Sequence, residues 1–271
     1  MKKLIALLLA AFMLVGTLAL VGCDKDNDPA GTPNSGNNST DLYTLVTTAL
    51  KKTTDATSYS GSIKQVVTEN VMGHSTEVRA DYTIKASLAD PAKPLIGMEG
   101  NMVMSGETVP YVYYFDGEWM YYSMYGEGYK MQSSLEQFEK DAGGIDSLFT
   151  DLPKALFDGM TATTEGNTTK VTLTADSDTF KNMYTKLITD MFTDVLGENI
   201  TPVVVTDVMI AVSVANGYVM GYDLSFVGTY TIGSDSISYS YSQAVNFDSV
   251  DKEVTVTPPE GYENFMELDW G

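Results

Sequence analysis

Long stretches of this chain alternate between apolar and polar residues, and this period of two constrains the fold more than any other feature. From Val78 to Leu88 every apolar or aromatic residue is followed by a polar or charged one. Such a segment can bury one of its faces only as a β-strand. Tight turns at Asp116-Gly117, Gly166-Asn167 and Asn216-Gly217 predict hairpins between neighbouring strands. The chain is therefore expected to build a continuous antiparallel sheet.

Other segments have the spacing of amphipathic helices. Apolar residues recur at helical intervals over 42–50 and, most regularly, over 180–196, where Gly197 ends the pattern. Two shorter helices are expected over 133–138 and 147–157. A hairpin-rich sheet combined with these helices predicts an α+β fold class.

Two neighbouring strands, Tyr111–Phe115 and Trp119–Tyr125, are apolar or amphipathic on both faces. Helices can cover one of these faces, so the other must be covered by a second layer of the protein or by a hydrophobic ligand. Methionines are frequent in the same set of strands and beside it: Met98, Met102, Met104, Met120, Met124 and Met131. Methionine adapts to varied apolar ligands, but it also fills gaps in ordinary cores. The residues leave both interpretations open.

The first residues have the organisation of a bacterial export signal with a lipid attachment site. Lys2 and Lys3 precede an uncharged apolar run that ends in Leu20-Val21-Gly22-Cys23, and this tetrapeptide resembles a lipobox. Residues 1–22 are therefore predicted to be a lipoprotein signal peptide. Cys23 is predicted to carry the lipid that anchors the protein to the extracytoplasmic face of a bacterial membrane.

The remainder of the chain is expected to consist of a linker and one domain. Residues 23–40 lack large apolar side chains after the cysteine, which is typical of a flexible polar tether. Residues 41–271 have the length of one large domain that can bury a sufficient core without disulfides.

Composition and motifs argue against several classes of function. The whole chain has a formal charge of −20, which disfavours nucleic acid and anionic headgroups as partners. Cys23 is the only cysteine and His74 the only histidine, so a disulfide, a thiol nucleophile, a histidine triad and a zinc site are not expected. His74 is predicted to be a solvated turn residue, and Glu118 an exposed acid at a hairpin tip. We therefore predict no enzymatic activity, no cofactor and no metal.

Several motifs together resemble a known family. The entry Ser58-Tyr59-Ser60-Gly61 into long strands, the segment Met102-Val103-Met104-Ser105-Gly106 and the hairpin from Phe115 to Tyr121 are similar to those of LolA/LppX-type envelope lipoproteins and of a Gram-positive lipoprotein family related to them. The resemblance implies a strongly curved antiparallel sheet, a half-barrel, whose concave face is closed by helices around an apolar cavity. In characterised members that cavity holds lipid or lipoprotein acyl chains, so the resemblance implies lipid binding.

These observations predict a monomeric, membrane-anchored lipoprotein that binds a hydrophobic ligand, such as a lipid or glycolipid. An alternative is a structural or interaction lipoprotein with a packed core and no ligand. A carboxylate-based hydrolase is a third hypothesis, which no constellation of residues supports. The expected lining of the cavity comprises residues of the apolar strands and of the long helix: Met98, Met102, Met104, Tyr111, Tyr113, Trp119, Tyr121, Leu187 and Met191.

Overall fold

The computed structural model describes residues 39–71, 73–90, 92–134, 160–174, 204–232 and 235–268, with the single residues 182, 185 and 189. The leader, Cys23 and most of the tether lie outside the described residues. The same holds for the helix expected over 147–157 and for most of those expected over 133–138 and 180–196. Asn182, Thr185 and Thr189, the described residues of the last of these, are helical.

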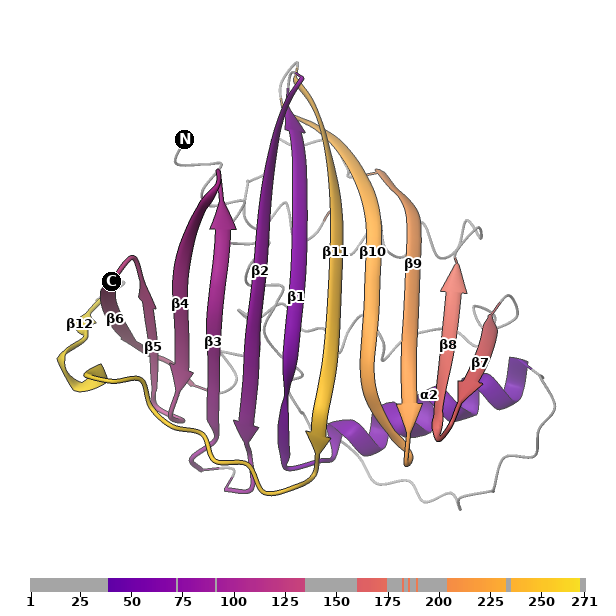
Figure 1. The fold of residues 1–271 in the computed structure, drawn as a ribbon, viewed down its shortest axis with the longest axis horizontal. Coiled ribbons are helices and arrows are strands. Elements are labelled where there is room, and N and C mark those ends of the chain that lie inside the picture. The colour runs from indigo at the N-terminus through magenta and orange to yellow at the C-terminus, as the bar shows by residue number, and fades with distance from the viewer. Residues whose placement is uncertain are drawn as a thin grey trace.

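The described strands form one sheet of twelve strands. They are β1 (Ser58–Val71), β2 (His74–Ser87), β3 (Leu95–Met104), β4 (Glu107–Phe115), β5 (Trp119–Met124), β6 (Glu127–Gln132), β7 (Thr161–Glu165), β8 (Thr168–Thr174), β9 (Val204–Ala215), β10 (Tyr218–Ile232), β11 (Asp235–Val250) and β12 (Met266–Glu267). Their order across the sheet is β12-β6-β5-β4-β3-β2-β1-β11-β10-β9-β8-β7 (Figure 1). The sheet is therefore open, with β12 and β7 at its edges.

Two runs of hairpins meet at the centre of this sheet. The run β1 to β6 extends to one side and the run β7 to β11 to the other, and β1 pairs with β11 along nearly their whole length (Figure 1). All pairs are antiparallel except β12 with β6, which is parallel. The predicted Asn216-Gly217 turn joins β9 to β10, and both of its residues have positive φ, 55° and 78°. This is the backbone conformation that makes Asn-Gly a preferred hairpin turn.

The predicted α+β class, a sheet with helices packed over its concave face, is wrong for the described residues. They form a large mixed sheet with a single continuous α-helix, α2 (Ser39–Thr54), which contacts β10 and β9. Figure 1 shows α2 crossing the sheet beside the ends of these strands. The physical reason is that most apolar residues of the chain recur with period two, and a segment with that pattern can bury them only as a strand.

One side of α2 is fastened to the sheet. Leu42, Val46, Ala49 and Thr53 recur every three or four residues and are buried. The Thr53 hydroxyl donates to the Ala49 carbonyl at 2.7 Å and accepts the backbone N–H of Val219 on β10 at 2.8 Å. These bonds satisfy a buried hydroxyl and fix where the helix ends relative to β10.

The face of the sheet on the α2 side, called the inner face below, is mainly apolar. Alternate residues of neighbouring strands pack there in one buried cluster with α2. On the central strands its buried members are Tyr59, Ile63, Gln65, Val67 and Glu69 of β1; Ala80, Tyr82, Ile84 and Ala86 of β2; Ile237, Tyr239, Tyr241, Gln243, Val245 and Phe247 of β11; and Tyr222, Leu224, Phe226 and Tyr230 of β10.

The opposite, outer face is polar over the central strands but carries an apolar patch over β4 and β5. There it is covered by residues 254–268, called the C-terminal segment, which crosses the lower end of the sheet and adds β12 beside β6 (Figure 1). The short 3₁₀ helix η2 (Tyr262–Asn264) lies within this segment. Tyr262 packs against Tyr114 and Tyr121, with ring centroids 6.1 and 5.2 Å apart. The second apolar face of these strands is thus buried by the chain itself.

Candidate functional site

The methionines and tyrosines of β3 and β4 that were expected to line a cavity share the inner face. Met98 is paired with Tyr113 across β3 and β4, and Met102 and Met104 follow at alternate positions. Met98, Met102 and Tyr113 are buried, whereas Met104 and Tyr111 are half-buried. Burial raises the pKa of the Tyr111 hydroxyl, with a contribution from the nearby Tyr122. These five residues therefore share one face of β3 and β4, where Met98, Tyr111 and Tyr113 pack in the main buried cluster and Met102 and Met104 in a smaller one.

Two other expected lining residues lie on the outer face instead. Tyr121 is paired with Tyr114, and both pack under the C-terminal segment together with Trp119. The Tyr121 hydroxyl donates to Oδ2 of Asp116 at 3.1 Å. The inner-face positions of β5 are occupied by Met120, Tyr122 and Met124, as their pairing with β4 requires.

The remaining two expected lining residues, Leu187 and Met191, lie outside the described residues. The neighbouring Thr185 is described, and its Oγ1 accepts the backbone N–H of Val205 on β9 at 3.3 Å.

A pair of glutamines interrupts the apolar inner face at the centre of the sheet. Gln65 and Gln243 are direct partners across β1 and β11, and their exposed fractions are 2% and 3%. The Tyr82 hydroxyl donates to Gln65 Oε1 at 3.4 Å, and the Tyr222 hydroxyl donates to Gln243 Oε1 at 3.2 Å. Tyr241 also hydrogen-bonds the Gln65 side chain. Two amides and three phenols are therefore held together within the buried surface.

A carboxyl group, Glu69, is buried further along the same face of β1. Its exposed fraction is 4%, and Oε1 accepts the Tyr230 hydroxyl at 3.1 Å. Burial raises the pKa of Glu69, and the bond from Tyr230 opposes that change. Burial and the adjacent carboxyl both raise the pKa of Tyr230. An acid in such surroundings is a candidate functional group, because its charge is poorly solvated.

Two glycines on the inner face leave room for close contacts with the neighbouring strand. A Cβ at Gly228 would lie 2.3 Å from Cε1 of Tyr239, so the ring of Tyr239 covers that glycine. A Cβ at Gly100 would lie 2.5 Å from Cα of Tyr82, so this glycine allows the backbone of β2 to approach closely.

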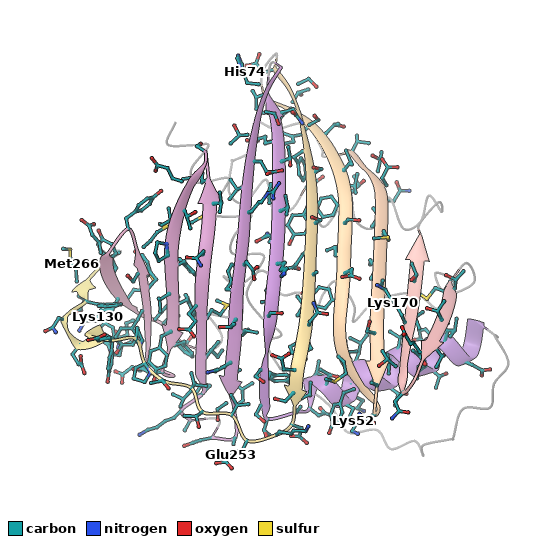
Figure 2. The ribbon with its side chains drawn as sticks, in the orientation of Figure 1. Lys52, His74, Lys130, Lys170, Glu253 and Met266 are labelled. Atoms are coloured by element: carbon teal, nitrogen blue, oxygen red, sulfur yellow. The ribbon has the colours of Figure 1, made fainter. Side chains whose placement is uncertain are left out.

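Positively charged side chains of the described strands all occupy outward register positions. They are Lys64, Arg79, Lys85, Lys130 and Lys170. Lys64 and Lys170 pair with Asp81 and Asp223 at 3.7 and 2.8 Å. Lys130, labelled near β12 in Figure 2, lies over the Trp119 ring on the outer face, with Nζ 5.1 Å from the centroid. Within the described strands the inner face thus carries a carboxyl group but no cation.

The residues considered for catalysis are exposed and separate. His74 lies at the tip of the β1–β2 hairpin, as Figure 2 shows, and is exposed as predicted. Glu118 is exposed between β4 and β5. Within the described part of the chain, no three residues among His, Cys, Asp and Glu are grouped as metal ligands would be.

Sequence reasoning overlooked Gln65, Glu69 and Gln243. A signal for them exists, because each stands where the period-two pattern of its strand places an inward residue. Isolated polar residues at inward positions of otherwise apolar strands are the feature that could have identified them.

None of the helices in the described ranges is long and apolar enough to cross a membrane.

Comparisons with known proteins find similarity among solved structures. No protein-family model matches this chain, and no curated protein matches it. Among solved structures the chain is similar to the crystal structure of LprF from Mycobacterium bovis. The alignment covers 82% of this chain and 98% of that one, at 13% sequence identity and a TM-score of 0.41. A similarity of this degree carries no argument about function.

Proposed function

We propose that this chain is a non-enzymatic lipoprotein that binds a hydrophobic ligand, a lipid or glycolipid, against the inner face of its sheet. Lipidation at Cys23, after removal of residues 1–22, anchors it to the extracytoplasmic face of a bacterial membrane. Residues 23–40 act as the tether of a single folded domain, and the protein is a monomer. A carrier held this way works at high local concentration beside its source membrane.

The observation that carries the proposal is the width of the apolar inner face. The face carries apolar residues from β5 to β8, and the strands that α2 mainly contacts are β10 and β9. The part formed by β3 and β4 is lined by methionine and tyrosine, with Met98 and Met102 at its centre. Such side chains combine a large apolar area with the ability to adapt to a flexible acyl chain.

A packed core without ligand is the second candidate, and one observation favours it. The buried phenols of Tyr82, Tyr222 and Tyr230 already have hydrogen-bond partners within the face. Polar groups satisfied in this way are usual in a protein interior. The two candidate functions differ in whether a hydrophobic ligand can bind against the inner face.

The test is retention of a ligand by a protein that begins at residue 24. This protein is purified without detergent, extracted with organic solvent and analysed by mass spectrometry. We expect a co-purified lipid in the native sequence. Met102→Glu and Met104→Glu place a charge on the inner face and should abolish retention while the protein stays folded, because a carboxylate is costly to bury against acyl chains.

The matched control is Asn101→Glu, which places the same charge on the exposed outer side of the same strand. It should retain the lipid. A native protein that is always recovered empty and binds no apolar dye would exclude the carrier function. Unfolding of both methionine variants would assign the methionines to a packed core, in favour of the second candidate.

A further inference from the structure

The glutamine pair on the inner face has one amide group that the fold leaves without a hydrogen-bond partner. Gln243 Oε1 accepts the Tyr222 hydroxyl, whereas Gln243 Nε2 has no partner although it is fully buried. A buried N–H donor without an acceptor costs free energy that a leucine of similar size would not cost. A site selected only for packing would therefore favour an apolar residue at this position.

The position of this donor suits a ligand that runs along the inner face. Gln243 lies between Tyr241 and Val245 on β11 and opposite Gln65 on β1, so apolar surface extends from it in both strand directions. If the alkyl parts of an amphiphile lay on the apolar surface on both sides of Gln243, its polar group would meet the amide.

The charges around the face restrict the kind of polar group. Cationic side chains of the described strands lie at outward positions, and Glu69 is four residues from Gln65 on the same face of β1. Four residues of strand span about 13 Å. A phosphate or carboxylate there would have no counter-ion on those strands and would face a carboxyl group, which disfavours it.

We propose that Gln243, supported by Gln65, is a specificity-determining residue that donates a hydrogen bond to an uncharged acceptor of the bound amphiphile, such as an ester carbonyl or a hydroxyl. This inference rests on the proposed function, because it requires that apolar molecules enter the inner face. It adds that the preferred ligands are neutral.

The experiment compares three probes of similar chain length: methyl palmitate, palmitate, and heptadecane, the alkane with as many carbon atoms as methyl palmitate. Their affinities are measured by displacement of a fluorescent apolar dye from the protein that begins at residue 24. For this protein we expect methyl palmitate to bind about three- to tenfold more tightly than the alkane, the effect of one net hydrogen bond. Palmitate should bind more weakly than methyl palmitate.

Gln243→Leu should reduce the preference for methyl palmitate over the alkane to about one, with the affinity for the alkane unchanged or higher. The control Gln132→Leu makes the same substitution at an exposed outward position of β6 and should keep the preference. If Gln243→Leu does not fold, the affinities of methyl palmitate and the alkane for the unsubstituted protein alone test whether an uncharged acceptor is preferred.

The outcomes separate this inference from the proposed function. If no probe displaces the dye, or the dye itself does not bind, the proposed function fails and this inference with it. If the ester and the alkane bind equally well to the unsubstituted protein, apolar binding stands and the role of Gln243 is overturned; its amide then serves a bound water or the core. Tighter binding of palmitate than of its methyl ester overturns the preference for neutral ligands.

Discussion

At the scale of single residues, the inner face combines apolar packing with a few polar groups whose burial has measurable consequences. Glu69 is the sharpest case, since its carboxyl group is buried beside Tyr230 and its pKa is raised by loss of solvation. The folded state therefore holds the proton of Glu69 more tightly than the unfolded state does. The contribution of Glu69 to stability is therefore fully present below the ordinary glutamate pKa of 4.5 and is lost as the pH rises through the raised folded pKa.

This sign gives a prediction for Glu69→Gln. The amide keeps an oxygen for the Tyr230 hydroxyl but has no charge to desolvate, so the variant should be more stable than the native protein at neutral pH. The difference should be about 1.4 kcal/mol for each unit by which the native pKa is raised. It should shrink to about zero below pH 4.5. Urea unfolding at acidic and neutral pH measures it.

The control for this prediction is Glu99→Gln, because Glu99 is exposed on the outer side of β3. It should change the free energy of unfolding little at either pH. A Glu69→Gln protein that is less stable than the native protein at neutral pH would show that the carboxylate has a favourable partner.

At the scale of elements, the C-terminal segment explains why β4 and β5 are apolar on both faces. Its ring contacts continue to β6, because a Cβ at Gly128 of that strand would lie 2.4 Å from Cδ1 of Phe265. Phe265 therefore lies directly on the backbone of β6, where β12 pairs. The segment covers apolar surface and occupies part of an edge that could otherwise pair with another chain.

We expect Phe265→Ala to lower the free energy of unfolding by about 1–3 kcal/mol, since a half-buried ring loses its contacts with β6 and Tyr121. Met266→Ala is the matched control. Met266 is the next residue, is 62% exposed and lies at the outer edge of the sheet in Figure 2, so its truncation should have little effect. Urea midpoints of the two variants give the comparison. Equal midpoints would mean that the segment does not stabilise the sheet.

The sequence predicted these elements unevenly. Hairpins at Asp116-Gly117 and Asn216-Gly217 could be predicted because their turn residues have a local conformational reason to be there. Val254 and Val256 alternate with polar residues as in a strand but belong to none, because they pack on the outer face against Leu95 and Tyr114. A segment that covers a sheet face is held by contacts between residues far apart in the chain, so a local sequence pattern cannot predict it.

At the scale of the whole molecule, the central pairing of β1 with β11 joins the two hairpin runs into one surface. That pairing could not be predicted from turns, since its partners are far apart in the chain. It decides which residues share the inner face: Met98 and Tyr113 do, whereas Trp119 and Tyr121 lie opposite. A shift of register by one residue would have exchanged these sets, so face assignment was the step that spacing alone could not make.

Tertiary packing is also the reason why the predicted fold class is wrong although many strands are predicted well. Alternation in segments such as 78–88 is a property of each strand alone and could be read directly. The placement of helices over a face depends on tertiary packing, and within the described residues only α2 takes that role as a continuous helix. The candidate site is likewise predicted only in part. Gln65, Glu69 and Gln243 are missed because the predicted lining includes only apolar and aromatic residues.

The central claim is that an apolar ligand occupies the inner face, and nuclear magnetic resonance of isotope-labelled methionine methyl groups tests it most directly. Methyl palmitate is titrated into the protein that begins at residue 24, with methyl signals assigned by single substitutions. The account predicts shifts at Met98, Met102 and Met104, which share the inner face, and none at Met266, exposed at the sheet edge. Shifts at Met266 without shifts at the three inner methionines would place binding on the surface and contradict the account.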